Sequence, residues 1–272
     1  MTSEFTLSPH RSTAELTTTL SMVRVLVLGG HGKVALQMTK ILAAHNHKVT
    51  SVIRNPDHTK DIIDQYPENP SLIDPVMASI EETDEEGAKK LMEGIQWVVW
   101  SAGAGGKGGP ERTKAVDEIA AKRFIKAALL APSVTKFLMV SASSSRRSPA
   151  SYWTESDIGT FKKTWESIGV YSEAKTVADE YLYDESRKSP KSNWVDICLR
   201  PGSLSDNPGT GKVDLGKAKL GGSVPREDVA AVAVELLEKE NGGGLWVDLI
   251  GGSEPIGQAV ERVVSQRITS RE

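Results

Sequence analysis

Blocks of apolar and polar residues alternate along this chain in a way that favours strands and helices in turn. From Val23 to Leu28 the chain is almost continuously apolar, which is typical of a strand covered on both faces of a parallel sheet. Three glycines follow within four residues, and apolar positions then recur at helical spacing from Val34 to Leu42. A buried strand that breaks into glycines and restarts as a helix predicts a nucleotide-binding turn.

The alternation continues through the rest of the chain. Further strands are predicted at residues 48–53, 75–79, 96–100, 136–140, 194–199 and 245–249. Helices are predicted at residues 57–65, 84–92, 112–130, 171–187, 226–238 and from 256 onward. This order predicts an α/β fold with a doubly wound parallel sheet and a small C-terminal lobe on the substrate side.

No linker rich in proline, glycine or charge divides the chain into independent domains. Residues 22–272 are therefore expected to form a single domain, with substrate-side elements at about 146–170 and 203–225. Residues 1–21 are rich in serine and threonine without clear periodicity, so we expect a flexible N-terminal extension outside the core.

The connection between residues 146 and 169 is long and combines charged residues with Tyr152, Trp153, Phe161 and Trp165. Long loops at the carboxyl edge of a parallel sheet often carry substrate contacts or act as lids. A lid here would favour an aromatic pocket for a planar or cyclic apolar substrate. The alternative is a surface helix that packs its aromatic side chains against the body of the protein.

The composition of the chain gives no indication of binding to nucleic acid, membrane or metal. The net charge of −3 gives no indication of a nucleic-acid-binding surface. No apolar stretch approaches the roughly 20 residues that cross a bilayer, and the N-terminus lacks a secretory pattern, so we expect a cytoplasmic protein without membrane contact. The single cysteine, Cys198, lies in an apolar stretch and is expected to be an unreactive core thiol. The histidines show no metal-ligand spacing, so no metal is expected.

The glycine turn supplies the first candidate binding residues. Gly29, Gly32 and Ala35 have the G-x-x-G-x-x-A spacing that lets the backbone approach a pyrophosphate held at a helix N-terminus. His31 lies inside this turn, and its expected role is to place backbone near the pyrophosphate. The alternative is a tight turn with no ligand. The cofactor-binding candidates of this segment are Gly29, Gly30, His31, Gly32, Lys33 and Val34.

The end of the second predicted strand should decide between NAD and NADP, because the adenosine ribose lies there. Sequences that select NAD usually place an acidic residue at this point, whereas this chain has Arg54. A guanidinium can hold a 2′-phosphate through paired, charge-assisted hydrogen bonds, so we predict NADP(H) as the cofactor. Lys33 would supply a second positive charge, although either side chain can also be a solvated surface residue. Ser79 and Ile80, after the third strand, fall where contacts with the adenine edge are expected.

Tyr171 and Lys175, in the segment YSEAK, are a second set of candidate catalytic residues. Residues four apart share one face of a helix, so a phenol and an ammonium group can face the same pocket. A lysine close to a phenol lowers the pKa of the phenol, which would let Tyr171 exchange a proton with a substrate oxygen near neutral pH. The spacing alone is common, and the preceding glycine turn is what favours a catalytic interpretation.

Taken together, the motifs resemble those of atypical short-chain dehydrogenases/reductases. The resemblance is closest to the NAD(P)H-binding, NmrA-like group that also includes biliverdin reductase B-like flavin reductases. The segments that carry it are LGGHGKVA at 28–35, VIRN at 52–55, SAGAGG at 101–106, YSEAK at 171–175 and LRPGSL at 199–204. The resemblance covers nearly the whole chain from Val23 onward and implies a Rossmann fold.

The same resemblance assigns roles to residues that the sequence pattern leaves open. It implies that Ser101, Ala102 and Gly103 border the ribose and nicotinamide side of the cofactor. Pro201 and Gly202 would pass close to the nicotinamide. The tyrosine of YSEAK would be the acid/base, and its lysine would bind the nicotinamide ribose.

One position departs from the family pattern. Members with the full catalytic set usually carry a serine just after the fifth strand, where it binds the substrate carbonyl, but the matching residue here is Ala142. Ser143 or Ser141 would substitute if the loop is shifted by one residue. Loss of such a donor commonly costs about a hundredfold or more in rate, which would leave a weak reductase or a nucleotide-binding protein without turnover.

The sequence therefore predicts an NADP(H)-dependent oxidoreductase that passes a hydride between nicotinamide and a carbonyl or conjugated small molecule, such as a quinone or flavin. Two alternatives stay open, namely a redox sensor that binds NADP(H) without turnover and contacts a protein partner, and a non-redox isomerase or cyclase on the same fold. No pattern identifies the substrate or the oligomeric state.

Overall fold

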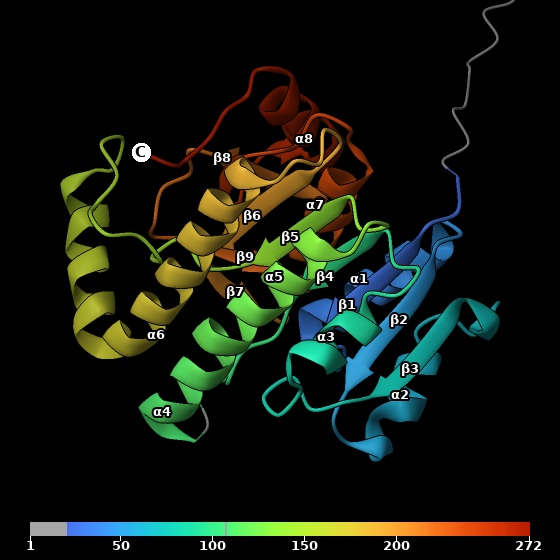
Figure 1. Ribbon diagram of the computed structural model, residues 1–272. Coiled ribbons are helices and arrows are strands. Elements are labelled where there is room, and N and C mark those ends of the chain that lie inside the picture. Colours follow the sequence, from blue (N-terminus) through green and yellow to red (C-terminus); the bar gives the residue numbers. More distant parts are fainter. Residues whose placement is uncertain (1–20, 107) are drawn as a thin grey trace, which may run out of the picture.

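The computed structural model describes residues 21–106 and 108–272. Of the expected N-terminal extension, residues 1–21, only Ser21 lies within these ranges. A nine-stranded sheet forms the centre of the molecule (Figure 1). Its strands are β1 (Arg24–Leu28), β2 (Lys48–Ile53), β3 (Ile73–Met77), β4 (Trp97–Trp100), β5 (Lys136–Val140), β6 (Val195–Pro201), β8 (Lys212–Gly216), β10 (Leu245–Gly251) and β11 (Glu254–Pro255).

The order of strands across the sheet is β11-β8-β10-β6-β5-β4-β1-β2-β3. The strands from β10 to β3 pair in parallel, and β8 pairs antiparallel with both β10 and β11. Two short strands, β7 (Ser203–Ser205) and β9 (Ser223–Pro225), form a separate parallel pair. The doubly wound parallel sheet is thus confirmed, and part of the expected substrate-side segment, β8, belongs to the main sheet.

Helices cover both faces of this sheet. They are α1 (Lys33–Ala44), α2 (Thr59–Ile63), α3 (Glu85–Leu91), α4 (Gly109–Thr113), α5 (Ala121–Leu130), α6 (Glu155–Lys188), α7 (Arg226–Glu238) and α8 (Ile256–Ser265). Short 3₁₀ helices occupy Pro56–His58 and Pro70–Leu72, and a π-helix, Lys114–Ala120, joins α4 to α5. In Figure 1, α3 to α6 lie in front of the sheet, and α1, α7 and α8 lie behind it.

Each face of the sheet has its own hydrophobic core, because successive side chains of a strand point to opposite faces. Val25 and Val27 of β1 belong to the core shared with α1, α7 and α8. Leu26 and Leu28 belong to the core shared with α3, α5 and α6. The continuous apolar run in β1 is therefore explained by burial on both sides.

The sequence pattern places several elements at their observed bounds, including Lys48–Ile53, Lys136–Val140 and Arg226–Glu238. The third strand is predicted two residues too late, since it spans Ile73–Met77 rather than 75–79. This strand lies at the edge of the sheet, where Pro75 is tolerated and burial is incomplete, so its apolar signal is weak.

The first half of α6 occupies most of the predicted long connection, so the surface-helix alternative is correct and a loop over 146–169 is wrong. Thr154 and Asp157 form a reciprocal capping box at its start. The indole N–H of Trp153 donates to the carbonyl of Ala218 at 3.1 Å, and that of Trp165 donates to the carbonyl of Ser144 at 3.0 Å. The aromatic side chains therefore pack against the body of the protein.

The sheet positions a crevice at the carboxyl end of β1. Strand β1 pairs with β2 on one side and with β4 on the other, with Leu28 opposite both Val52 and Trp100. The chain connections on the two sides of β1 consequently run in opposite directions. In open α/β sheets, ligands bind in the crevice that opens at such a reversal.

Candidate cofactor and active site

The glycine turn between β1 and α1 packs closely against the ends of the neighbouring strands. Gly29 has a φ of +85°, and a Cβ added there would lie 2.7 Å from the Cα of Ala102. A Cβ at Gly30 would lie 2.0 Å from the Oγ of Ser51, and the amide of Gly30 donates to the carbonyl of Val52 at 2.9 Å. No side chain caps α1, so its first amide groups remain available to an anion.

A cavity of about 320 Å³ lies beside this turn, at the carboxyl ends of β1, β2, β3 and β4. Most of the predicted cofactor residues line it. They are Gly29, Gly30, His31, Gly32, Arg54, Ser79, Ile80, Ser101, Ala102 and Gly103. Four separate segments of the sequence thus converge on one cavity, in the order that a dinucleotide-binding fold requires.

Other predicted binding residues lie outside this cavity. Lys33 is exposed and pairs with Asp206, and Val34 is buried beneath the turn. Pro201 is buried at the end of β6, and the amide of Gly202 donates to the carbonyl of Leu249 at 2.8 Å. The interpretation of these residues as cofactor contacts therefore stays a prediction.

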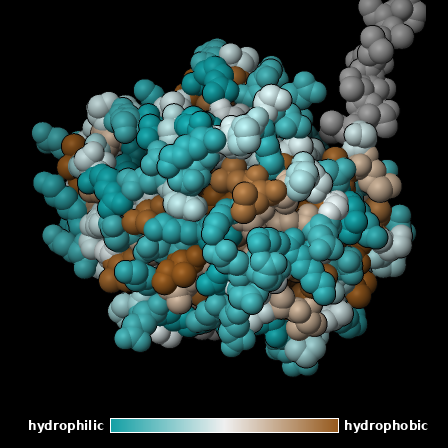
Figure 2. Space-filling view, in the orientation of Figure 1, coloured by the Kyte–Doolittle hydropathy of each residue, from teal (hydrophilic) through white to brown (hydrophobic). Residues whose placement is uncertain are grey.

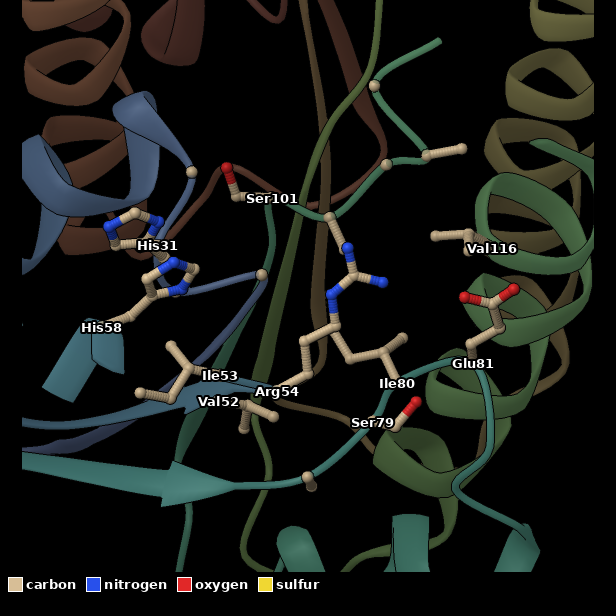
Figure 3. Close-up of a pocket in the computed structure, with 18 of the residues that line it drawn as sticks. His31, Val52, Ile53, Arg54, His58, Ser79, Ile80, Glu81, Ser101 and Val116 are labelled. Atoms are coloured by element: carbon tan, nitrogen blue, oxygen red, sulfur yellow. The ribbon is translucent and has the colours of Figure 1, made fainter. Parts of the chain in front are cut away.

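Arg54 follows the last residue of β2, and its exposed side chain extends into the cavity (Figure 3). The two imidazoles of His31 and His58 lie together on one side of it, and Ile80 and Glu81 lie on the other. The His58 imidazole stacks on that of His31, with ring centroids 3.5 Å apart. The sequence analysis did not single out His58, although a basic residue four positions after Arg54 was a signal for it.

The cavity also contains an ion pair that the sequence analysis missed. Arg112 of α4 donates from Nε to the carboxylate of Glu81 at 3.0 Å, and both residues line the cavity. The two are 31 residues apart in the sequence, so no local pattern reveals the pairing.

Lys175 is buried beside the cavity and is held by a carboxylate. Its Nζ lies 3.1 Å from Oδ1 of Asp117 and donates to the carbonyls of Ala102 at 3.3 Å and Val140 at 3.4 Å. Burial alone would lower the pKa of Lys175, but Asp117 outweighs this effect and the pKa is raised. The side chain is therefore a fixed cation at the ends of β4 and β5.

Asp117 is a residue of the site that sequence reasoning missed. It lies on the π-helix, and its Oδ2 accepts a hydrogen bond from the amide of Ala104 at 3.0 Å. A Cβ at Gly103 would lie 2.9 Å from its Oδ1. One carboxylate thus fixes both the glycine-rich segment after β4 and the ammonium group of Lys175. Local π-helical turns are frequent at functional sites, and this feature is not legible from the sequence.

Tyr171 lies one helical turn before Lys175, whose Nζ is 5.9 Å from the centre of the phenol ring. The expected lowering of the Tyr171 pKa is wrong. Burial of the phenol raises this pKa, and the charge of Lys175 offsets only part of the rise. Among the described residues the hydroxyl has no hydrogen-bond partner. Tyr171 is thus a protonated phenol at neutral pH.

The serines after β5 differ in what they can offer a substrate. The hydroxyl of Ser141 donates to Oδ2 of Asp179 at 2.6 Å, within the core. Ser143 is buried, its amide donates to the carbonyl of Pro201 at 3.0 Å, and its hydroxyl has no partner among the described residues. Ala142 has no hydroxyl. Ser143 is therefore the better of the two catalytic candidates.

Several expected features concern residues outside the cavity. Cys198 is fully buried, and burial raises the pKa of its thiol, as expected for an unreactive core thiol. In residues 21–106 and 108–272, no cluster of three His, Cys, Asp or Glu side chains is placed to hold a metal ion. The helices of this same part of the chain lack the combination of length and apolarity that a membrane span requires.

Comparison with known proteins agrees with this geometry. A family model described as NAD(P)H-binding matches residues 29–240, which include the glycine turn and the Tyr171–Lys175 pair. The UPF0659 protein C216.03 of Schizosaccharomyces pombe is 34% identical over 244 residues, which cover 88% of this chain and 94% of that protein. The uncharacterized sugar epimerase YhfK of Bacillus subtilis is 26% identical over 89% of this chain and 100% of its own length.

Solved structures show the same fold. A Bacillus halodurans protein described as an NAD-dependent epimerase/dehydratase superposes with a TM-score of 0.70 at 26% identity, covering 88% of this chain and 99% of that one. Gre2 of Candida albicans, solved as an NADPH complex, superposes with a TM-score of 0.65 at 14% identity, covering 85% of this chain and 78% of that one. With the glycine turn and the cavity in place, the chain belongs to the NAD(P)H-binding family whose model it matches.

Proposed function

We propose that this protein is an NADP(H)-dependent reductase that transfers a hydride to a conjugated small molecule, such as a quinone or flavin. The observation that carries the proposal is the position of Arg54, whose guanidinium enters the cavity at the point where an NAD-selective site usually has a carboxylate. A guanidinium forms strong paired hydrogen bonds with a phosphate, and it offers nothing comparable to a ribose hydroxyl.

The residues of the cavity fit a dinucleotide. The backbone at Gly29 and Gly30 packs so closely against its neighbours that only glycine fits, and no side chain caps the first amides of α1 beside this turn. In this proposal the turn and the first amides of α1 hold the pyrophosphate, Arg54 holds the 2′-phosphate, and Ser79 with Ile80 borders the adenine. When bound, reduced nicotinamide supplies the hydride.

Tyr171 would supply the proton. The acceptor gains a hydride and one proton, which together make a two-electron reduction, and the oxidised cofactor leaves. The pKa of Tyr171 is raised, so the phenol is protonated at neutral pH and carries the proton that a reduction consumes. Lys175 would hold the nicotinamide ribose side of the site, at the end of β4 to which it is already bonded.

A conjugated acceptor is favoured over an isolated carbonyl by the serine positions. Hydride addition to an isolated carbonyl concentrates negative charge on one oxygen, which needs preorganised donors. Here the hydroxyl of Ser141 is committed to Asp179 and residue 142 is alanine, so of these three positions Ser143 alone has an uncommitted hydroxyl. A quinone or flavin spreads the charge over a ring system and depends less on such donors.

Calorimetric titration with NADPH, NADP⁺, NADH and NAD⁺ tests the cofactor assignment. Replacement Arg54→Ala should weaken NADPH binding by about 10- to 100-fold and leave NADH binding nearly unchanged. Arg24→Ala serves as the matched control. Arg24 is an exposed arginine at the first residue of β1, whereas the cavity lies at the carboxyl ends of the strands. Equal loss of NADH and NADPH affinity in the Arg54 variant would contradict the proposed phosphate contact.

Turnover tests the reaction. Tyr171→Phe should lower NADPH oxidation by a quinone or flavin by about 10²-fold or more while NADPH affinity persists. Tyr181→Phe, on the same helix but against the α5 side, should have no effect on turnover. A protein that binds NADPH but oxidises none with either acceptor class would instead support the redox-sensor alternative. Substrate conversion without net loss of NADPH would support an isomerase or epimerase, as the name of the B. subtilis relative suggests.

A further inference from the structure

We propose that the stacked imidazoles of His31 and His58 form, together with Arg54, a phosphate-binding edge whose charge makes the preference for NADPH over NADH increase as the pH falls. This inference rests on the proposed NADP(H) function and assigns a specificity role to His31, from the glycine turn, and to His58, which belongs to no motif of the sequence.

The two histidines come from different segments and meet at the cavity. His31 lies in the glycine turn, and His58 ends the 3₁₀ helix that follows β2. Their ring planes are inclined by only 10° and their centroids are 3.5 Å apart, so the imidazoles are in full face-to-face contact. Both residues line the cavity that also contains the guanidinium of Arg54. A phosphate in this part of the cavity would therefore meet three nitrogen-bearing side chains.

The two rings differ in what holds them. Nε2 of His31 lies 3.0 Å from Oδ2 of Asp61, which fixes the orientation of this ring. The nitrogens of the His58 ring have no partner in the part of the chain that the structure describes. His58 is half-buried, so its ring is ordered by stacking while its nitrogens remain available to a ligand. The ring of His31 thus holds the ring of His58 in place by stacking, and the nitrogens of His58 can bind an anion.

Two carboxylates near this edge already have partners of their own. Asp61 is occupied by His31, and across the cavity Glu81 is paired with Arg112. Asp57 precedes His58 in the same 3₁₀ helix and is exposed. Histidine is the side chain that ordinarily gains charge between pH 8 and 5. Two stacked imidazolium rings repel one another, and a dianionic phosphate compensates for that repulsion. Proton uptake and phosphate binding at this edge therefore favour each other.

The test is the pH dependence of binding at constant ionic strength. Between pH 8.5 and 6.5, the affinity for NADPH should increase by about three- to tenfold, whereas the affinity for NADH should change by less than about twofold. The fragment 2′,5′-ADP should reproduce the NADPH trend and 5′-AMP should reproduce the NADH trend, since these two fragments differ only in the 2′-phosphate.

His58→Gln should reduce the increase in NADPH affinity between pH 8.5 and 6.5 by at least about half, because one of the two stacked imidazoles is removed. His45→Gln is the matched control, since His45 lies at the other end of α1 and contacts Glu238. Circular dichroism melting confirms that each variant is folded. An unchanged pH dependence in His58→Gln, or an equal dependence for 5′-AMP and 2′,5′-ADP, would overturn the inference.

Failure of the proposed function gives a different result. If none of the four nucleotides binds at any pH, the NADP(H) function itself fails and the inference fails with it. If NADPH binds with an Arg54-dependent affinity that does not vary with pH, the function stands and only the role of the histidine pair is overturned.

Discussion

Gly29 is the residue at which the glycine turn depends most on the absence of a side chain. Its φ is +85°, and a Cβ would lie within 2.9 Å of three backbone atoms of Ser101 and Ala102, which cannot move independently. We predict that Gly29→Ala lowers the free energy of unfolding by about 1–3 kcal/mol and abolishes NADPH binding. Urea unfolding and calorimetric titration measure the two effects.

Gly257→Ala provides the comparison for this prediction. Gly257 lies in α8, and nothing lies within 4 Å of an added Cβ. The alanine should be neutral or stabilise the protein by up to about 1 kcal/mol, with unchanged nucleotide affinity. Normal NADPH binding by a folded Gly29→Ala protein would mean that the turn does not contact the pyrophosphate.

Ionisation of Asp179 is expected to make the stability of the folded protein depend on pH. Burial raises its pKa to about 6, and the charge of Arg200 offsets part of this effect. The ordinary aspartate pKa is about 3.9, so the folded protein holds this proton more tightly than the unfolded chain does. The resulting stabilisation is fully present below about pH 4 and is lost as the pH rises through about 6.

We therefore predict a specific change in Asp179→Asn, whose amide resembles a protonated carboxyl. The free energy of unfolding of the native protein, minus that of the variant, should fall as the pH is raised from about 4 to 7. Denaturant unfolding across this range measures it. Asp184→Asn alters an exposed residue of the same helix, and its profile should run parallel to that of the native protein. A difference for Asp179→Asn that rises with pH would contradict the raised pKa.

At the scale of elements, α6 shows how a helix is stabilised without a strong apolar pattern. Thr154 and Asp157 satisfy its first amide groups, and Gly159 lies in its first half with open space around an added Cβ. We predict that Gly159→Ala raises the free energy of unfolding by about 0.5–1 kcal/mol, because alanine favours the helix. Thr154→Ala should lower it by about 1 kcal/mol through loss of the cap. Thermal and urea unfolding would show neither effect if residues 155–167 formed an irregular loop.

The same helix marks the limit of prediction from sequence. The strands Lys48–Ile53 and Lys136–Val140 are legible because burial in a parallel sheet demands a short apolar run. The segment 155–167 is mostly polar, and only its tertiary contacts reveal which residues are buried. The helix bends at Ile168, just before Tyr171, where φ is −132° and ψ is 37°. No sequence pattern indicates this bend.

In the candidate site, too, some residues can be predicted from the sequence and others cannot. The glycine turn and Arg54 are local in sequence, so their chemistry follows from spacing and from the strand that precedes them. Asp117 and His58 act through partners that are distant in the chain, and the pKa of Tyr171 depends on how deeply the phenol is buried. Neither long-range pairing nor burial of a single polar group can be inferred from one sequence.

At the scale of the whole molecule, a buried polar network joins the C-terminal part of the chain to the loop after β5. Asp248 of β10 accepts hydrogen bonds from Arg146 at 2.7 Å, Tyr152 at 2.7 Å and Ser270 at 3.0 Å. Arg200 lies 3.6 Å from the same carboxylate and donates to the carbonyl of Ser145 at 2.6 Å. On the face shown in Figure 2, by contrast, apolar side chains form small areas among hydrophilic ones. Polar contacts within the interior therefore hold the loop that carries Ser141 and Ser143.

Replacement of Asp248 by alanine tests this link between distant parts of the chain. The change leaves the buried guanidinium groups of Arg146 and Arg200 without their carboxylate, and removing one partner of a buried ion pair costs about 3–5 kcal/mol. We predict a loss of this size in urea unfolding, whereas Asp74→Ala, at an exposed position of β3, should change stability by less than about 0.5 kcal/mol. In the double variant Asp248→Ala/Arg146→Gln, part of the loss should be recovered, because one unpaired charge is gone. Additive losses in the double variant would show that Asp248 stabilises the fold through its other contacts rather than by neutralising Arg146.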